Sequence, residues 1–432
     1  MKLLILTTYY LPEANAASVR MSQIVKRFSY KDKDIQHIRV IAFNPAYKCK
    51  HEKGVNEKDK VEVIRHARKI SPAFVFMPQS LNPLTLITWI YISLKEIAKY
   101  NPDVILTTTP PFAPAIASCI ASIILNKPYV IDYRDDLTSV IDSIAETKRF
   151  YIKYPLKVAN KLMSGLLFHS LKRASLISTV NEVLQKKLLD LNRNVITVPN
   201  GIDIQELNEV KENFDKEKVL EKNGISHSED SMLIVYVGDL DMPYCTPEII
   251  LEPLKALLKK GYDARYIIIG DGKRREPIEE MRKEMSLEEV VFLVGRKEHR
   301  EVLELLLACD TAFYSVQKKY PQSKHVIAAK VYEYIGCGLP ILALSDEGSA
   351  VSELVKTHDI GVFVSWGEID RMGNALRKLL ESKKYARNVQ LHYSYIIEKF
   401  DRNRGIDLLY DNVKALIVEC SAPTTPKKTV RA

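Results

Sequence analysis

The sequence predicts an α/β protein made of two doubly wound, Rossmann-like halves. Short apolar runs of strand length alternate with helical stretches along nearly the whole chain, as is typical of parallel strands buried on both faces. The turn Pro199-Asn200-Gly201 interrupts this alternation near the middle. The length of 432 residues is enough for two or three domains. We therefore expect two domains that face each other across a cleft, with the ligand at the carboxyl ends of both sheets.

Residues 1–198 form the first predicted domain. Its expected strands are short runs rich in Leu, Ile and Val, over 3–6, 39–43, 61–65, 103–107, 129–132, 176–180 and 195–198. The stretches between them have apolar residues at helical spacing, over 16–28, 89–99, 113–125, 155–171 and 182–191. Strand and helix alternate, which predicts a parallel sheet.

Residues 199–385 form the second predicted domain, in which the alternation resumes after a charged stretch. Strands are expected over 232–237, 266–269, 290–293, 311–314 and 341–344, and helices over 247–260, 277–285, 301–307, 330–335 and 370–380. Residues 386–420 are predicted to form a C-terminal helix that packs back toward the first domain. The tail over 421–432 contains prolines and basic residues, and we expect it to be disordered.

The net charge of +9 is concentrated in one stretch of the first domain. Between Glu146 and Lys187 there are nine Lys or Arg residues and two Glu. Such a stretch favours a partner with phosphates: nucleic acid, anionic lipid or a pyrophosphate-linked substrate. No surface of interleaved aromatic and basic residues accompanies the charge, so we expect no nucleic-acid partner.

Cysteine and histidine usage predicts a cytoplasmic protein without a metal site. The six cysteines are scattered and form no C-x-x-C pair, which favours reduced thiols. The nine histidines show no metal-ligand spacing. Two long uncharged runs, over 71–94 and 104–126, are interrupted by prolines, so buried strand–helix units are favoured over membrane spans. The start of the chain also lacks the pattern of a signal peptide.

The stretch over 328–344, AAKVYEYIGCGLPILAL, predicts a helix, a glycine-broken turn and a buried strand. Gly338 suits the position just after a helix, and Pro340 prevents the helix from continuing. Lys330 and Glu333 are three residues apart and can lie on one helical face. At the end of a strand–helix unit such a pair could hold a phosphate and a ribose. The alternative is an exposed ion pair on a surface helix.

Several motifs occur in an order that resembles one enzyme family. They are YVGDL (236–240), IIIGDG (267–272), VFLVGRKEHREVLELLLACD (291–310) and KVYEYIGCGLPILAL (330–344) in the second half, and YYLPE (9–13), PDVILTTTPP (102–111), IDYRDD (131–136) and TVPNGID (197–203) before them. This ordered set resembles the retaining glycosyltransferases of family 4 (glycosyl transferases group 1), which have the GT-B fold. The resemblance covers nearly the whole chain.

The resemblance implies a binding site for a nucleotide-sugar donor in the second domain. Glu333 would accept hydrogen bonds from the ribose hydroxyls, and Lys330 would lie against the diphosphate. Gly238 would let backbone N–H groups approach the pyrophosphate, unless it only ends a strand. Arg296 would lie near the base, or in a solvated loop. His325 occupies the position of a family acid eight residues before Glu333, where it could meet a sugar hydroxyl.

Asp135 is the candidate catalytic residue, on the acceptor side. It follows the strand over 129–132 and would accept the proton of an incoming hydroxyl. The alternatives are a carboxylate that caps the next helix or one that pairs with Arg134. In the family the donor phosphate itself is generally thought to act as the base, and no Asp-x-Asp motif has the right context here. We therefore expect retention without a divalent metal or cofactor.

The basic stretch gains a second interpretation from the resemblance. Lys153, Lys157 and Lys161 are spaced by four and flanked by aromatic residues, which would suit a helix on an anionic membrane. Many relatives act on lipid-pyrophosphate-linked sugars, so acceptor and membrane would meet there. A solvated helix face is the alternative.

The leading hypothesis is a glycosyltransferase that moves a sugar from a UDP- or GDP-sugar to a saccharide acceptor, lipid-linked, on the inner face of a membrane. A second hypothesis is a non-catalytic GT-B module that binds nucleotide-sugar or glycan in a glycan-assembly complex, which His325 favours. A sugar-nucleotide epimerase of the same architecture is disfavoured by the transferase-type motifs of the first half.

Overall fold

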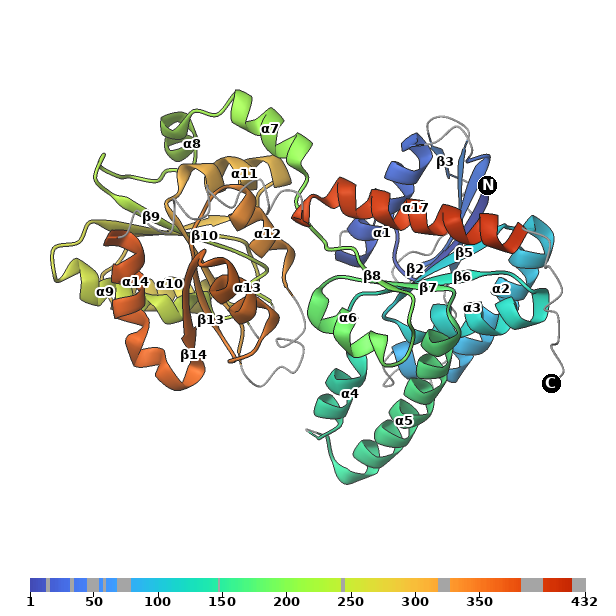
Figure 1. Ribbon diagram of the computed structural model, residues 1–432. Helices are drawn as coiled ribbons and strands as arrows, with labels where there is room; N and C mark the ends of the chain where they lie inside the picture. The colour runs from blue at the N-terminus through green and yellow to red at the C-terminus, as the bar shows by residue number, and fades with distance from the viewer. Residues whose placement is uncertain are drawn as a thin grey trace, which may run out of the picture. The chain divides into compact units, whose positions relative to one another are not determined.

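The computed structural model describes residues 1–12, 16–31, 35–44, 54–56, 60–67, 79–146, 148–241, 245–317, 327–381 and 399–421. The chain divides into two compact units. Met1–Val198 and Gly405–Ala432 form the first unit, and Pro199–Arg404 form the second. Each unit is a doubly wound α/β structure with its own sheet (Figure 1).

The sheet of the first unit has eight strands in the order β3-β4-β2-β1-β5-β6-β7-β8. All pair in parallel except β3, which lies antiparallel to β4 at one edge. The bounds are β1 (Lys2–Thr7), β2 (His37–Asn44), β3 (Gly54–Asn56), β4 (Val61–Ala67), β5 (Val104–Thr109), β6 (Tyr129–Tyr133), β7 (Leu176–Thr179) and β8 (Val195–Thr197).

Helices cover both faces of this sheet, because alternate side chains of the strands point to opposite sides. Leu3 and Ile5 of β1 share a core with α1 and α17, whereas Leu4 and Leu6 share one with α2, α3, α5 and α6. The bounds are α1 (Ala16–Lys31), η2 (Gln79–Leu81), α2 (Pro83–Tyr100), α3 (Phe112–Leu125), α4 (Leu137–Glu146), α5 (Phe150–Arg173), α6 (Glu182–Leu189) and α17 (Arg402–Ser421).

A buried ion pair joins α1 to the strand β6 of this sheet. Arg20 donates from Nε and Nη2 to the two carboxylate oxygens of Asp132 in β6, at 2.9 and 2.8 Å. Ser178 of β7 donates to the same carboxylate at 2.8 Å. Burial alone would raise the pKa of Asp132, but the Arg20 charge and these hydrogen bonds outweigh it and hold the pKa below its usual value.

The second unit has a six-stranded, wholly parallel sheet in the order β11-β10-β9-β12-β13-β14. Its strands are β9 (Met232–Val237), β10 (Ala264–Ile269), β11 (Val291–Gly295), β12 (Thr311–Ser315), β13 (Ile341–Ser345) and β14 (Gly361–Ser365). Its helices are α7 (Ile204–Glu212), α8 (Lys216–Lys222), η3 (Pro247–Ile250), α9 (Leu251–Leu258), α10 (Arg275–Glu284), α11 (His299–Ala308), α12 (Ala329–Gly336), α13 (Ala350–His358), η5 (Trp366–Arg371) and α14 (Met372–Glu381).

The predicted fold class, two Rossmann-like halves with parallel sheets, is confirmed. Two strands, β3 and β14, and four α-helices were missing from the sequence-based prediction. One is α4, in which Leu137, Ile141 and Ala145 recur every fourth residue. Another is α13, which follows its N-cap Ser349. The remaining two are α7 and α8, which lie in the charged stretch and follow the N-caps Asp203 and Asp215, whose side chains accept from backbone N–H groups of the first turn.

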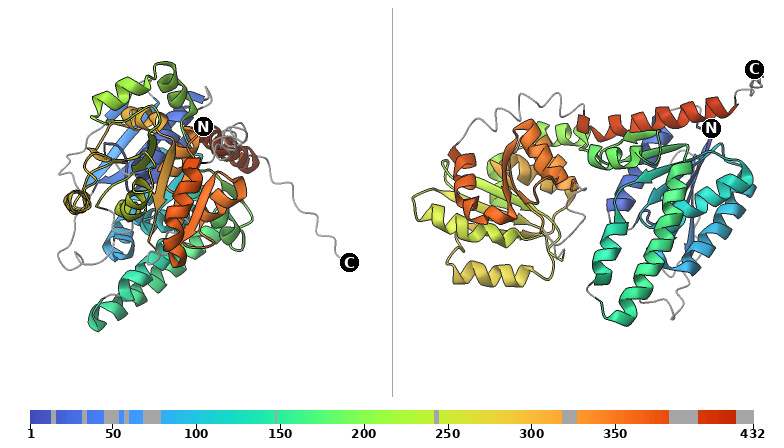
Figure 2. Two further views of the ribbon diagram at one scale, coloured as in Figure 1. Left: turned by 90° about the vertical axis from the view of Figure 1, so that its left-hand side faces the viewer. Right: turned by 60° about the horizontal axis from the view of Figure 1, so that its bottom comes forward.

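Several predicted boundaries differ from the structure. The helix predicted over 155–171 begins five residues earlier, at Phe150, and α4 packs against it as a hairpin that extends from the sheet (Figures 1 and 2). The helix predicted over 247–260 divides into η3 and α9. Part of the helix predicted over 386–420 is α17, while 382–398 and 422–432 lie outside the described residues.

Two further features concern membranes and thiols. Among the described residues, none of the helices combines the length and the hydropathy that crossing a bilayer requires. Four described cysteines are free thiols: Cys119, Cys245, Cys309 and Cys337.

Candidate active site

The helix α12 and the turn after it position the two residues that the sequence singled out. Gly338 has φ +78°, and its N–H donates to Ile335 at 2.9 Å while the Leu339 N–H donates to Tyr334, also at 2.9 Å. This pair of hydrogen bonds is the Schellman termination, which a glycine at this position favours. The predicted role of Gly338 is therefore confirmed, and the helix ends directly before β13.

The ammonium group of Lys330 is half-buried against two tyrosine rings. Its Nζ lies 4.1 Å from the centroid of the Tyr236 ring in β9 and 5.6 Å from that of Tyr314 in β12. No described residue forms a hydrogen bond or an ion pair with it. Burial lowers the pKa of Lys330, because a charged group loses its hydration there. A cation in contact with rings, but without a carboxylate, is suited to bind an anion.

Gly238 lies directly after β9, beside this ammonium. A Cβ on Gly238 would lie 3.0 Å from Lys330 Nζ and 2.7 Å from the Tyr236 hydroxyl. The Gly238 N–H donates to the Ile269 carbonyl at 2.9 Å, so this particular amide is engaged in the sheet and does not point at a ligand. A side chain at this position would collide with both groups, so the glycine allows Lys330 and the Tyr236 hydroxyl to lie this close to the end of β9. The structure therefore brings together two of the predicted donor residues, Gly238 and Lys330.

Glu333 is buried on the same helix, with 9% of its surface exposed. Its Oε1 is 3.1 Å from His299 Nε2, and the other ring nitrogen, Nδ1, is 2.9 Å from Glu206 Oε1. These three residues come from α12, α11 and α7. Hydrogen bonds with Glu333, opposed by burial and supported by Glu206, raise the pKa of His299 to about 9. The imidazole is thus charged at neutral pH and donates to both carboxylates.

The remaining predicted donor-binding residues are Arg296 and His325. Arg296 is exposed and follows Gly295, which has φ +76°, in the loop between β11 and α11. This loop also leads to His299, so Arg296 and the histidine that contacts Glu333 belong to one connection. His325 lies outside the described residues.

Asp135, the candidate catalytic residue, lies in the loop after β6 of the first unit and is half-buried. No described residue forms a hydrogen bond or ion pair with it. Arg134 donates to Thr108 and to the Pro110 carbonyl instead, and Asp136 accepts from Thr138 at the start of α4. Burial raises the pKa of Asp135, against the opposing charge of Arg134. Neither a helix cap nor an Arg134 ion pair therefore accounts for Asp135.

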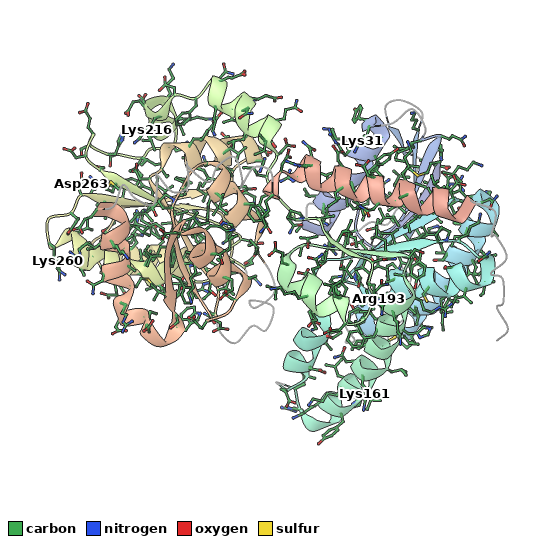
Figure 3. The ribbon with its side chains drawn as sticks, in the orientation of Figure 1. Lys31, Lys161, Arg193, Lys216, Lys260 and Asp263 are labelled. Atoms are coloured by element: carbon green, nitrogen blue, oxygen red, sulfur yellow. The ribbon has the colours of Figure 1, made fainter. Side chains whose placement is uncertain are left out.

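The predicted membrane patch lies on α5, also in the first unit. Lys153 and Lys157 both form ion pairs with Glu146 of α4, and hydrogen bonds from these lysines lower the pKa of Glu146 to about 2. Lys161, labelled in Figure 3, is exposed. One carboxylate therefore offsets part of the charge that the sequence suggested was available to a membrane.

Sequence reasoning missed Tyr236, Tyr314 and His299. The tyrosines lie in strands that are neighbours in the sheet but far apart in the chain, so their joint contact with Lys330 depends on the strand order. His299 lies within the VGRKEH segment of a quoted motif, and its position at the start of a helix was the available signal. No cluster of three or more potential metal ligands occurs in the described residues.

Two Rossmann-like units in one chain, each with its own parallel sheet and flanking helices, are the architecture of the GT-B class of proteins. Two family models match in succession: Glycosyltransferase Family 4 over residues 36–206 and Glycosyl transferases group 1 over residues 216–391. The chain belongs to the group 1 glycosyltransferases with the GT-B fold. This confirms the predicted membership of glycosyl transferases group 1 and the GT-B fold, and a hexosyltransferase-type enzyme is the class that this membership supports.

Individual relatives are distant. N-acetyl-alpha-D-glucosaminyl L-malate synthase of Bacillus anthracis is 20% identical over 230 residues, which are 52% of this chain and 56% of that protein. Sucrose-phosphate synthase from Thermosynechococcus elongatus has a similar structure, with a TM-score of 0.70 and 13% identity over 98% of this chain and 100% of that one. Anabaena HepE in complex with UDP has a TM-score of 0.62 and 17% identity over 96% and 100%. These structures show a shared fold.

The raised pKa of His299 predicts a pH-dependent stability. A histidine whose folded pKa of about 9 exceeds the unfolded value contributes stability that is complete below about pH 6.5 and is lost as pH rises through about 9. Calorimetric melting of wild type and His299→Gln should therefore converge between these pH values, because the variant carries no charge to lose. Parallel melting curves across this range would contradict the assigned role of the imidazolium.

Proposed function

We propose that this protein transfers a sugar from a nucleotide-sugar donor, a UDP- or GDP-sugar, to a saccharide acceptor, with retention and without a metal ion. The proposal rests on one observation: the half-buried Lys330 ammonium lies against the Tyr236 ring beside Gly238, and it has no carboxylate partner among the described residues. A diphosphate has the charge that this site lacks. Family membership and the UDP bound to HepE support the same ligand.

The donor diphosphate would be held by charge and the ribose by hydrogen bonds. As the glycosidic bond to the nucleotide breaks, negative charge builds on the β-phosphate, and the Lys330 ammonium stabilises it more than it stabilises the intact donor. The Glu333 carboxylate, three residues further on, would accept from the ribose hydroxyls. Arg296 would contact the base, and His325 a sugar hydroxyl.

Retention follows in this proposal from the donor phosphate acting as the base. The leaving phosphate takes the proton of the acceptor hydroxyl, and the acceptor oxygen attacks from the face that the phosphate leaves. Asp135 would orient that hydroxyl: it has no partner among the described residues, and burial raises its pKa. No protein nucleophile and no divalent ion take part in this sequence.

The alternative is a non-catalytic module that binds a nucleotide-sugar or glycan in a glycan-assembly complex, which His325 in place of a family acid favours. Purified protein incubated with UDP-, GDP- and ADP-sugars distinguishes the two, because transferases slowly pass the sugar to water. We expect hydrolysis of a UDP- or GDP-sugar, undiminished by EDTA, with the released sugar initially in the donor's anomeric configuration. Binding without any hydrolysis would favour the module, and an inverted product would contradict retention.

Replacing Lys330 tests the assignment of the diphosphate. Lys330→Gln removes the cation but keeps a polar side chain, so affinity for UDP or GDP should fall about 10-fold or more, the usual range for a hydrogen bond to a charged group. Affinity for the free nucleoside, which has no phosphate, should change little. Calorimetric titration measures both. Lys356→Gln, which removes an exposed lysine paired with Glu347, is the control. An equal loss of nucleotide affinity in both variants would contradict the assignment.

We propose further that the acceptor is lipid-linked and that the protein binds peripherally to the inner, cytoplasmic face of a membrane. Large apolar side chains are exposed along one side of α5, at every fourth residue: Tyr154, Val158, Leu162 and Leu166, with Val158 68% and Leu162 66% exposed. The helix contains no acidic residue. We call these four residues the apolar stripe. The neighbouring helices α3 and α2 add exposed Ile123, Ile124, Ile87 and Tyr91.

The apolar stripe, rather than the lysine row, is the stronger support for membrane binding. Lys153 and Lys157 are paired with Glu146, whereas burying aliphatic groups in lipid is favourable by about 0.8 kcal/mol per CH₂. The exposed cations Lys161, Lys172 and Arg173 add attraction to anionic headgroups.

Membrane binding is tested by co-sedimentation with phosphatidylglycerol-containing vesicles. The double variant Val158→Glu/Leu162→Glu should lose at least about 10-fold in partitioning, since two charged groups replace inserted side chains, while nucleotide affinity stays unchanged. Leu189→Glu, on α6 and 45% exposed, is the matched control. Equal partitioning of the double variant and wild type would contradict this proposal. So would a dimer in light scattering that the double variant dissociates, because the stripe would then bind a second copy.

A further inference from the structure

We infer that His299 is a positioning residue, which holds the Glu333 carboxylate in the orientation that receives the ribose hydroxyls of the donor, and that Glu206 in turn fixes the His299 ring. The inference rests on the proposed function, since it assigns how the ribose-binding carboxylate of that site is oriented. It concerns three residues from three helices: α7, α11 and α12.

Both nitrogens of the His299 ring are engaged by carboxylates. Nε2 is 3.1 Å from Glu333 Oε1, and Nδ1 is 2.9 Å from Glu206 Oε1. An imidazole that donates from both nitrogens must be protonated. The two contacts on opposite sides of the ring fix its plane as well as its position. A ring held in this way presents Nε2–H to Glu333 in one direction only.

Only one of the two carboxylate oxygens of Glu333 forms a hydrogen bond with a described residue. His299 occupies one site on Oε1, while Oε2 forms no hydrogen bond with a described residue. An ionised carboxylate has about four acceptor sites, so capacity remains for two adjacent hydroxyls. Without His299 the Glu333 side chain could adopt several rotamers. Fixing one of them when the donor binds would cost conformational entropy and weaken binding.

A purely structural role for this cluster is the competing explanation. The His299 side chain is 44% exposed and that of Glu206 is 36% exposed, so water screens these ion pairs and reduces the folding stability that the raised pKa of His299 implies. The Glu333 side chain is only 11% exposed. The main consequence of the cluster is therefore the fixed orientation of the buried carboxylate, not the joining of helices.

The test compares a nucleotide with its analogue that lacks the ribose hydroxyls. UDP and 2′,3′-dideoxy-UDP, or the guanine pair if GDP binds more tightly, are titrated calorimetrically into wild type and His299→Ala. We expect His299→Ala to weaken UDP about 10-fold, the scale of one charged hydrogen bond, and the dideoxy analogue about 2-fold or less. His299→Gln, which retains an N–H donor near the position of Nε2, should recover most of the UDP affinity. Equal weakening of both nucleotides would overturn the inference.

Two further variants separate failure of the inference from failure of the proposed function. Glu333→Ala should abolish the preference for UDP over its dideoxy analogue. If it does so and His299→Ala leaves the preference intact, the role of His299 is overturned while the donor site stands. If Glu333→Ala leaves the preference intact, the donor site and the inference both fail. His227→Ala, which removes another histidine–glutamate pair of the same unit, with Glu217, is the control and should change neither affinity.

Discussion

The site depends on one physical constraint: a half-buried ammonium that forms no ion pair with any of the residues that the structure describes. Lys330 lies against the Tyr236 and Tyr314 rings, whose faces are weakly attractive to a cation but do not offset its charge as a carboxylate does. Keeping such a group in the folded chain lowers the pKa of Lys330 and costs stability unless an anion arrives. Groups whose pKa is shifted by burial occur more often at binding and catalytic sites than elsewhere.

Glycines at the ends of two neighbouring strands permit the close packing around that ammonium. Gly238 follows β9, and Gly270 follows the neighbouring strand β10. A Cβ on Gly270 would lie 1.9 Å from the Gly238 carbonyl, so the two strand ends can approach each other only because Gly270 lacks a side chain. The helix α12 ends at the turn that contains Gly338, directly before β13, and Lys330 and Glu333 lie about one turn apart on it. Doubly wound sheets bind ligands at such carboxyl ends.

The sequence predicted the features that depend on local signals and missed those that depend on strand order. Apolar runs such as Leu3–Leu6 and Ile341–Leu344 identified parallel strands, and the Gly338–Pro340 pair identified a helix end. Charged helices such as α7 lack an apolar stripe strong enough to detect. The contacts of Lys330 with Tyr236 and Tyr314 arise because β12 lies beside β9, and the pairing of Lys157 with Glu146 arises because α4 folds back on α5. Neither juxtaposition can be read from spacing.

The most direct measurement is a crystal structure of the protein grown with UDP or GDP. The account predicts density for a diphosphate with an oxygen within hydrogen-bond distance of Lys330 Nζ, beside Gly238 at the end of β9, and ribose hydroxyls on Glu333. A nucleotide bound elsewhere, with the Lys330 ammonium still facing only the two tyrosine rings, would contradict it.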